Sequence, residues 1–350
     1  MRIMHVITTL ESGGAERMLS NLVNCDDENE HIIITIFQAK KHYEINKKVN
    51  IINLNLKNNR LNRVKMVLLI QKVIINVKPD IVQTWMKSNY IAPILKIVNS
   101  RIKFILNFRH GVNKNYNFIN KVILKKYMNI ADGHIFVSNS SFKEFEKIGF
   151  KFNNSVVITN GFTKKDYHYK SDINRELVFG YVGRFNIIKN QEFLIEEFNE
   201  FATNKNVKLI LAGRDLTYEK FDSYISNENK HKFIWKGEVN DPFQIYEGID
   251  ALILTSKSEG FPNVIGEAMS IGVPVISTNA GESYEIIGDS GFKINGNYGS
   301  LRKTLNELFN NKEELVIKSQ MAYKKIQDNY LIETKVEEYK KYYIKTIGGK

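Results

Sequence analysis

The sequence contains a single cysteine, five prolines and no long apolar run. Cys25 alone cannot form an internal disulfide, and that count fits a reducing compartment. The most apolar stretch, residues 66–77, is interrupted by Gln71 and Lys72 and is shorter than the roughly 20 residues that span a bilayer. The apolar run at residues 3–7 is too short for a signal peptide. We therefore predict a cytoplasmic protein with no segment that crosses a membrane.

Patterns that bind metal ions are also missing. The chain has no Asp-x-Asp triplet, and its cysteine and histidines do not have the spacing of a zinc site. We therefore predict no metal and no other cofactor, and expect that cations of the protein itself neutralise any bound phosphate. His5, His31 and His42 are interpreted as structural or exposed residues.

The length of 350 residues suits two domains, and a content of 43% hydrophobic and 25% charged residues is ordinary for a soluble protein. The charge is uneven. Residues 1–165 carry 26 basic against 11 acidic residues, and residues 51–130 carry 15 basic residues and one acid, Asp80. This asymmetry indicates an anionic partner such as phospholipid, a lipid diphosphate or nucleic acid. The alternative is a lysine-rich face that is simply solvated.

Short β-branched runs alternate with helical patterns, which is typical of parallel sheets with crossover helices. The fold class is therefore predicted as α/β with two Rossmann-like domains. We expect the first domain at 1–165, a polar linker at 163–175, the second domain at 176–330, and a C-terminal helix at 331–350 that returns to the first domain. The predicted strands are 3–8, 31–37, 50–56, 80–85, 104–108, 134–137, 155–159, 178–182, 207–212, 233–235, 251–255 and 273–277.

A glycine pair, Gly13-Gly14, follows the first predicted strand and leads into a helix. This arrangement presents backbone N–H groups and the positive end of a helix to a phosphate group. The pattern differs from the dinucleotide signature G-x-G-x-x-G, so it does not predict nicotinamide binding. By itself, the pair could equally be a tight turn.

Two carboxylates follow the predicted strand at 251–255. Glu259 falls in the loop after this strand, and Glu267 falls eight residues later in the helix that the loop opens. Ligands of doubly wound folds bind at this carboxyl edge of the sheet. Carboxylates there can hold sugar hydroxyls through charge-assisted hydrogen bonds. The general preference for acidic residues near a helix N-terminus would explain Glu259 but would not explain Glu267.

Two cations, Arg184 and Lys189, follow the first predicted strand of the second domain. A departing nucleoside diphosphate needs such fixed positive charge, because negative charge builds on the leaving oxygen. Taken alone, both residues could be ordinary surface positions. Together with the acidic pair, they indicate a site for a nucleotide sugar.

These motifs resemble those of the retaining GT-B glycosyltransferases of family 4. The segment from Glu259 to Met269 is similar to the family's Glu-x7-Glu region, and Gly183-Arg184 with Lys189 is similar to its phosphate-binding element. Gly13-Gly14 resembles the N-terminal glycine loop. Three further pairs match in order and spacing: His110-Gly111, Val137-Ser138 and Asn160-Gly161. The chain departs from the family at Glu282, where the pattern has a second glycine.

The resemblance implies a GT-B fold with a cleft between the domains, and a role for each matched residue. Glu267 would bind the ribose hydroxyls, Glu259 the donor sugar, and Arg184 and Lys189 the diphosphate. His110 would face the donor sugar near the reacting carbon and, with Glu259, Arg184 and Lys189, form the catalytic set. The remaining donor-binding positions implied by the resemblance are Gly13, Gly14, Phe261, Pro262, Asn263 and Val264.

The resemblance also implies transfer with retention of configuration, in a front-face displacement where the leaving phosphate helps to deprotonate the acceptor. We expect a UDP-sugar donor and a lipid-linked or other saccharide acceptor in bacterial surface polysaccharide or glycolipid synthesis. Two alternatives stay open. The chain could glucosylate a nucleic acid, which we consider the weaker reading, or it could bind a nucleotide sugar without turnover.

The basic first half further predicts a peripheral position on the anionic inner face of the plasma membrane. In residues 117–128, Lys121 and Lys125 lie four apart on an expected helix, with Lys126 beside them. The basic run 57–65 would join this patch, and each Lys or Arg near an anionic surface contributes about 1 kcal/mol. Alternatively, the apolar side of the 117–128 helix packs into the core and the lysines are only solvated.

Overall fold

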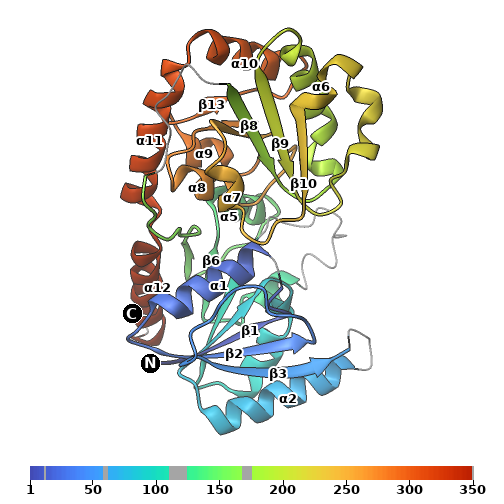
Figure 1. Ribbon diagram of the computed structural model, residues 1–350. Helices are drawn as coiled ribbons and strands as arrows, with labels where there is room; N and C mark the ends of the chain where they lie inside the picture. Colours follow the sequence, from blue (N-terminus) through green and yellow to red (C-terminus); the bar gives the residue numbers. More distant parts are fainter. Residues whose placement is uncertain (12, 58–61, 110–123, 168–175, 349–350) are drawn as a thin grey trace. The chain divides into compact units, whose positions relative to one another are not determined.

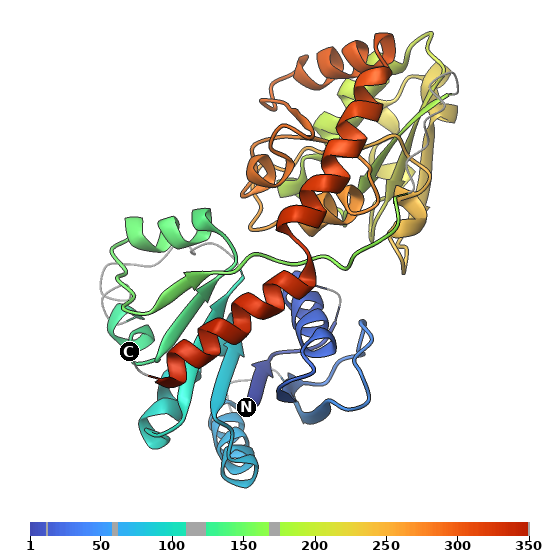
Figure 2. The same cartoon turned by 90° about the vertical axis from the view of Figure 1, so that its left-hand side faces the viewer.

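The computed structural model describes residues 1–11, 13–57, 62–109, 124–167 and 176–348. The chain forms two compact units (Figures 1 and 2). The first unit contains Met1–Gly161 together with Ile332–Lys350, and the second contains Phe162–Leu331. The C-terminal helix α12 (Ile332–Gly348) therefore belongs to the unit that the N-terminus begins.

The first unit is built on a parallel sheet with the order β3-β2-β1-β4-β5-β6-β7 among the described residues. Its strands are rich in isoleucine, valine and phenylalanine, and the central ones are buried along their whole length, as expected for a sheet covered on both faces. The strand bounds are β1 Arg2–Ile7, β2 Glu30–Phe37, β3 Asn50–Leu56, β4 Ile81–Trp85, β5 Lys103–Phe108, β6 Gly133–Phe136 and β7 Ser155–Val157.

Helices cover both faces of this sheet. On one face, α1 (Gly14–Cys25) and α12 pack side by side over a core that includes Leu19, Ile33 and Tyr339. On the other face, α2 (Asn62–Val77), α3 (Ala92–Val98) and α5 (Asn139–Lys147) bury Ile74, Leu95 and other apolar residues. A short 3-10 helix, η1 (Met86–Tyr90), follows β4.

The second unit has its own parallel sheet, with the order β10-β9-β8-β11-β12-β13 in the part of the chain that the structure describes. The order reverses between β8 and β11, and ligands of open parallel sheets bind at the carboxyl ends of the strands at such a reversal. The strand bounds are β8 Leu177–Val182, β9 Val207–Ala212, β10 Phe233–Gly237, β11 Ala251–Leu254, β12 Val275–Ser277 and β13 Phe292–Lys293.

Two core clusters flank this second sheet. One joins it to helices that include α6 and α10, through residues such as Phe198 and Leu305, and the other joins it to helices that include α7, α8, α9 and α11, through residues such as Tyr246 and Ala268. The bounds are η2 Ile187–Lys189, α6 Gln191–Ala202, η3 Tyr218–Lys220, η4 Asp222–Tyr224, η5 Asn227–Lys232, α7 Phe243–Tyr246, α8 Asn263–Met269, α9 Ser283–Ile287, α10 Ser300–Asn310 and α11 Glu313–Asn329.

The predicted α/β architecture with two parallel sheets is confirmed. Each strand predicted from the sequence overlaps an observed strand, and their ends differ by at most two residues. The last predicted strand starts two residues late in the structure, because the positive φ of Gly272 and the ring of Pro274 precede it. The short strand β13, Phe292–Lys293, was not predicted.

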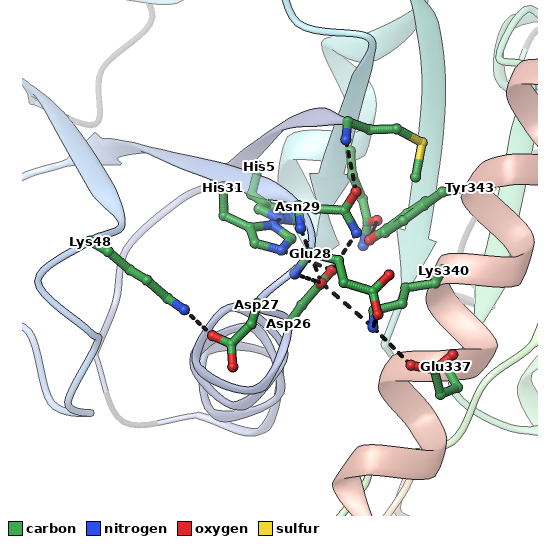
Figure 3. Close-up of polar contacts among 12 residues, drawn as sticks. His5, Asp26, Asp27, Glu28, Asn29, His31, Lys48, Glu337, Lys340 and Tyr343 are labelled. Carbon is green, nitrogen blue, oxygen red and sulfur yellow. Dashed lines mark hydrogen bonds and ion pairs between the residues drawn. The ribbon is translucent and has the colours of Figure 1, made fainter.

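Buried polar groups form a hydrogen-bonded chain across β4, β1 and β2 on the sheet face that α12 covers, and Figure 3 shows the part of it from His5 to Asp26. Trp85 Nε1 donates to His5 Nδ1 at 3.3 Å, His5 Nε2 lies 2.9 Å from His31 Nδ1, and His31 Nε2 lies 3.1 Å from an Asp26 carboxylate oxygen. An indole N–H can only donate, so each neutral imidazole must pass its own N–H toward Asp26. The tautomers of both histidines are therefore fixed by Trp85 and Asp26, which end this series of hydrogen bonds.

At the Asp26 end of this series of hydrogen bonds, the C-terminal helix contributes a lysine that faces the carboxylates. Burial raises the pKa of Asp26, but hydrogen bonds from His31 and Asn29 outweigh burial and lower this pKa to about 2. Lys340 of α12 places its Nζ 2.9 Å from Glu28 and 3.9 Å from Asp26 (Figure 3). The helix that ends the chain is thus tied to the turn between α1 and β2.

Candidate functional site

The second unit brings together two residues that the sequence predicted for one site. Lys189 lies at the end of η2, after β8, and Glu259 lies in the loop after β11. The Nζ of Lys189 is 2.6 Å from Oε1 of Glu259, and both side chains are largely shielded from solvent, with exposures of 26% and 13%. Ser256 Oγ donates to the same carboxylate oxygen at 2.6 Å. The two loops therefore form one polar centre at the carboxyl ends of β8 and β11.

The backbone of the Lys189 turn is held in place by β11. Thr255 Oγ1 lies 3.1 Å from the Lys189 carbonyl and 3.2 Å from the Asn190 carbonyl, and the Lys257 N–H donates to Ile188 at 2.8 Å. Asn190 adopts a left-handed conformation with φ 56°, which asparagine tolerates better than most residues. The position of the Lys189 ammonium is thus set by the fold of two neighbouring loops.

Arg184 follows β8 on the same side of the sheet. Its side chain is exposed and makes no hydrogen bond or ion pair with any described residue, but its backbone is fixed: the buried Gln191 donates to the Arg184 carbonyl at 2.9 Å and to the Tyr181 hydroxyl at 3.0 Å. Burial raises the pKa of Tyr181, and the Glu259 charge raises it further. The structure therefore presents the guanidinium of Arg184 to solvent from a rigid base.

The loop that carries Glu259 is backed by the loop between β12 and α9. Gly281 has φ +59°, and a Cβ at this position would come within 2.5 Å of the carbonyl oxygens of Glu259 and Gly260. The buried Glu282, which replaces a glycine of the family pattern, donates its backbone N–H to Gly260 at 3.3 Å. Close backbone packing here leaves little freedom for Glu259.

Glu267 lies on α8, as predicted, and is almost fully buried. Tyr246 of α7 donates its hydroxyl to Glu267 Oε2 at 2.9 Å. Gly266 beside it has no room for a side chain, because a Cβ would lie 2.1 Å from the ring of Phe162. The carboxylate of Glu267 is therefore oriented by a tyrosine and by tight packing of its helix.

Four further predicted residues lie between the two glutamates. Phe261 is half-buried and its ring stacks on that of Phe162 with centroids 6.3 Å apart. Pro262 is buried and occupies the N-cap position of α8, where no side chain caps the helix. Asn263 and Val264 form the first turn of α8, and both are half-buried.

The predicted glycine loop lies in the first unit. Gly14 begins α1, and Gly13 is its N-cap in an extended conformation without a side-chain cap. A Cβ on Gly13 would meet the carboxylate of Glu16 at 2.2 Å. Burial raises the pKa of Glu16. An acidic side chain thus lies against the glycine at the start of α1.

His110, the remaining predicted catalytic residue, lies outside the described residues. Its neighbour Arg109 is buried at the end of β5, donates to Asn160 Oδ1 at 2.9 Å and to the Tyr339 hydroxyl, and lies over the ring of Trp85. Burial lowers the pKa of Arg109, and the groups that accept its hydrogen bonds, the Ile158 carbonyl, Asn160 and Tyr339, are uncharged. Arg109 therefore fastens the end of β5 to α12.

The first unit also contains a pocket at its β3 edge, with a volume of about 300 Å³. Its wall is formed by β2, β3 and the loops after β1 and β2, and includes the aliphatic and aromatic side chains of Leu10, Phe37 and Ile51. Thr35 and Asn53, which are hydrogen-bonded to each other, and Lys41 also line the pocket. The pocket thus combines apolar side chains with residues that carry amide, hydroxyl and ammonium groups.

A search of the described residues finds no group of three His, Cys, Asp or Glu side chains arranged to hold a metal ion. Among the same residues, none of the helices is both long enough and apolar enough to cross a bilayer.

Two parallel α/β units, with the Lys189–Glu259 pair at the carboxyl ends of β8 and β11, define a two-domain α/β protein with a polar centre in its second unit. Residues 176–311 match the family model for glycosyl transferases group 1, and residues 12–164 match the model for glycosyltransferase family 4. The two matches are consecutive and together span most of the chain. The protein belongs to the group 1 glycosyltransferases.

Individual relatives agree with this assignment. The capsular polysaccharide biosynthesis glycosyltransferase CapM of Staphylococcus aureus is 29% identical over 42% of this chain and 40% of its own length. The lipopolysaccharide 1,6-galactosyltransferase of Salmonella typhimurium is 29% identical over 43% of each chain. The chain thus matches less than half the length of either relative.

The fold is confirmed over nearly the whole chain by the crystal structure of Anabaena HepE in complex with UDP. That structure has a TM-score of 0.80 with this one, covers 97% of this chain and 99% of its own, and is 18% identical. The predicted GT-B fold class, with two Rossmann-like domains, is therefore correct.

Sequence reasoning missed the residues that orient the predicted ones. Ser256 and Tyr246 contact the two glutamates, and Gln191 fixes the backbone of Arg184. Gln191 and Ser256 are close in sequence to the motifs, so a search for polar residues beside them could have found both. Tyr246 lies 21 residues from Glu267, and no local pattern marks it.

Proposed function

We propose that this protein transfers a hexosyl group from a UDP-sugar to a saccharide acceptor in the assembly of a surface polysaccharide. The observation that carries the proposal is the Lys189–Glu259 pair at the carboxyl ends of β8 and β11, in a chain of the group 1 family. The donor nucleotide is supported by HepE, which was crystallised with UDP. The acceptor class is supported by the names of the capsule and lipopolysaccharide relatives.

The donor site, in this proposal, consists of opposed charges with separate tasks. Arg184 and Lys189 bind the diphosphate and stabilise the charge that develops on it as the glycosidic bond breaks. Glu259 accepts hydrogen bonds from the sugar hydroxyls, and Glu267 accepts them from the ribose. The amides of Asn263 and Val264 complete the binding of the phosphates, and Phe261 and Pro262 shape the same loop.

The ion pair between Lys189 and Glu259 holds both side chains in a defined arrangement before a donor binds. Without a donor, each charge is satisfied by the other, so neither is left buried and unpaired. When a diphosphate approaches, Lys189 can contact both anions because an ammonium group has three donors. Glu259, which keeps the hydrogen bond from Ser256, is then free to accept from a sugar hydroxyl.

We further propose that the transfer retains the configuration at the anomeric carbon and needs no metal ion. The leaving phosphate oxygen takes the acceptor proton on the same face of the sugar. Gly13 and Gly14 are assigned to donor binding, and His110 is assigned to catalysis. The cations of the protein neutralise the phosphates in place of a metal. The acceptor is a lipid-linked or soluble saccharide that binds to the first unit, for which the pocket beside Thr35 and Asn53 offers hydroxyl and amide groups.

The test is a comparison of nucleotide sugars in a thermal-unfolding assay, followed by a transfer assay. A ligand at 100 times its Kd adds about 2.7 kcal/mol to the free energy of unfolding. UDP and one UDP-sugar should stabilise the protein, and Lys189→Ala should abolish the shift. NMR of the product should show the donor's anomeric configuration, and activity should persist in EDTA. Failure of every nucleotide sugar to bind would overturn the proposal.

Other outcomes favour other functions. Binding of a UDP-sugar without transfer to any saccharide would indicate a binding protein that has lost turnover. Loss of activity in EDTA, restored by Mg²⁺ or Mn²⁺, would show that a metal takes part.

A further inference from the structure

The outward faces of α2 and α3 have an unusual composition. Both helices pack on the same face of the first sheet, where α2 buries Ile70 and Ile74 and α3 buries Leu95. They are neighbours, because the side-chain amides of Gln71 and Asn99 exchange two hydrogen bonds of 3.0 and 2.6 Å. Their outer surfaces therefore form a continuous area, which we name the α2–α3 face.

This face is apolar where a soluble helix is normally polar. On α2, Val64, Leu68 and Ile75 are 70%, 64% and 60% exposed and lie at positions i, i+4 and i+11, which form one stripe. The three exposed residues of α3 are also aliphatic: Ile94, Ile97 and Val98, with exposures of 45%, 67% and 64%. A contiguous apolar patch of this kind marks an interaction surface.

The charge on the α2–α3 face has one sign. Lys65 and Lys72 are exposed on α2 beside the apolar stripe, and no carboxylate among the described residues pairs with either. The whole segment 62–98 contains a single acid, Asp80, which accepts from the backbone of Arg2. Apolar residues flanked by lysines are the composition of helices that lie in the interface of an anionic membrane.

We infer that the α2–α3 face docks the protein on an anionic lipid bilayer. Its aliphatic side chains enter the boundary between headgroups and acyl chains, and its lysines contact lipid phosphates. A second copy of the chain is a poorer partner, because a two-fold interface would place the lysines of one face opposite those of the other. The inference does not depend on the donor site or on the proposed transfer.

This surface shares Lys65 with the one predicted from the sequence but otherwise differs from it. Residues 58–61 and 117–123, with Lys121, lie outside the described residues. Lys125 lies in the described part, and its ammonium is 6.0 Å from the ring centroid of the buried Phe150. This ammonium therefore faces an aromatic ring of its own unit. Lys126 is exposed. The structure thus assigns the main membrane contact to α2 and α3. From the sequence, residues 66–77 of α2 were interpreted only as an apolar stretch too short to span a bilayer.

The experiment is co-sedimentation of the full chain with vesicles of phosphatidylcholine alone or with 30% phosphatidylglycerol (roughly a natural anionic content). The protein should pellet with the anionic vesicles at low salt and stay in solution with the neutral ones. Binding should weaken as salt shortens the Debye length from about 10 Å at 0.1 M to about 3 Å at 1 M. Lys65→Gln/Lys72→Gln should lower the partition coefficient by roughly 25-fold.

A second variant tests the apolar contribution. Leu68→Ser/Ile97→Ser/Val98→Ser should lower the partition coefficient on the order of 100-fold, without a change in Tm, because all three side chains are already exposed. The matched controls lie in the second unit, where Ile317→Ser/Met321→Ser removes exposed apolar groups of α11 and Lys303→Gln/Lys324→Gln removes exposed charge. Both controls should bind vesicles like the wild type.

Three results would overturn the inference. The wild type could remain in the supernatant with anionic vesicles at low salt. The variants of the α2–α3 face could bind as tightly as the wild type. Analytical ultracentrifugation could show a dimer that the triple serine variant dissociates, in which case the face joins two copies of the chain.

Discussion

The two units use buried polar side chains in different ways. In the second unit, the charged and hydroxyl groups of Lys189, Ser256 and Glu259 converge at the end of a sheet and remain partly open to solvent. In the first unit, the groups from Trp85 to Asp26 form a closed chain in which every end is occupied. The comparison indicates that the open centre of the second unit serves a ligand and that the closed chain of the first unit serves the fold.

The difference has a measurable consequence. Variants at the open centre should change donor binding or turnover by more than they change stability. Variants in the closed chain should do the opposite. The predictions below test this division, beginning with the largest effect.

Loss of a cation in the second unit should give the largest effect. Arg184→Ala and Lys189→Ala should each lower turnover by roughly two to three orders of magnitude, the scale for removing one fixed group at a developing oxyanion. The free energy of unfolding should change by less than about 1 kcal/mol in Arg184→Ala, because its side chain is exposed. In Lys189→Ala it should fall by about 1–3 kcal/mol, because the largely shielded Glu259 carboxylate loses its ion-pair partner. Steady-state kinetics and urea titration measure the two quantities.

The control for these variants is Lys208→Ala. Lys208 also forms a lysine–glutamate pair in the second unit, at 2.7 Å from Glu176. Lys208 lies on β9 and Glu176 directly before β8, away from the loops after β8 and β11. Its turnover should equal that of the wild type. Equal losses in Lys208→Ala and Lys189→Ala would show that the effect is one of general charge.

The two glutamates should separate binding from chemistry. Glu267→Ala should weaken UDP binding by roughly 10- to 100-fold, since a hydrogen bond to a charged group contributes about 1.5–3 kcal/mol. Glu259→Ala should leave UDP affinity nearly unchanged and slow transfer, because its partner in the complex is the sugar. Isothermal titration with UDP, alongside kcat, distinguishes them. Equal loss of UDP affinity in both variants would contradict the assigned roles.

Gly281 offers a test of how the Glu259 loop is held. Gly281→Ala should lower both stability and donor affinity, because φ +59° strains an L-residue and the new Cβ meets two backbone carbonyls at 2.5 Å. Gly237→Ala is the matched control: its φ is +64°, but nothing lies within 4 Å of the Cβ position. The control should lose only the cost of the backbone conformation, about 1–2 kcal/mol. If Gly281→Ala binds the donor normally, the packing of this loop has no part in the site.

Much of the second unit could be predicted from the sequence, because its signals are local. The strands are β-branched runs, and Glu259 and Glu267 belong to one short segment with a fixed spacing. By contrast, the pairing of Lys189 with Glu259 joins loops 70 residues apart, and only the strand order β8–β11 brings them together. Sequence reasoning therefore found both residues but could not find their contact.

The first unit was less accessible to sequence reasoning, since its polar contacts are long-range. Arg109 and Tyr339 are 230 residues apart, and His5 and Trp85 are 80 apart. No periodicity or motif links such pairs, because the first depends on the path of α12 across the sheet and the second on the pairing of β1 with β4. The interpretation of His5 and His31 as structural agrees with their burial, although their hydrogen-bonded partners could not be predicted.

The smallest expected effect is the dependence of the first unit on pH. Burial, with a contribution from His31, lowers the pKa of His5 well below its ordinary value, and burial also lowers that of His134. The folded protein therefore binds fewer protons than the unfolded chain below pH of about 6.5. Its stability is complete above that pH and falls as pH decreases, by about 1.4 kcal/mol per pH unit for each neutral histidine. Asp26, with its pKa lowered to about 2, adds a further loss only below pH of about 4.

His5→Gln isolates one of these contributions, because a glutamine amide can accept from Trp85 and donate to His31 but does not titrate. Between pH 6.5 and 4.5, the free energy of unfolding should fall less steeply in the variant than in the wild type. The two slopes should differ by about 1.4 kcal/mol per pH unit. Trp85 fluorescence during urea unfolding follows the first unit alone in a Trp235→Phe background. This replacement removes no hydrogen bond, because the Trp235 N–H has no partner among the residues that the structure describes. UDP affinity at pH 7.5 should match that of the wild type. Parallel pH profiles for the two proteins would show that His5 titrates in the folded state, and the closed chain from Trp85 to Asp26 would then have to be rejected.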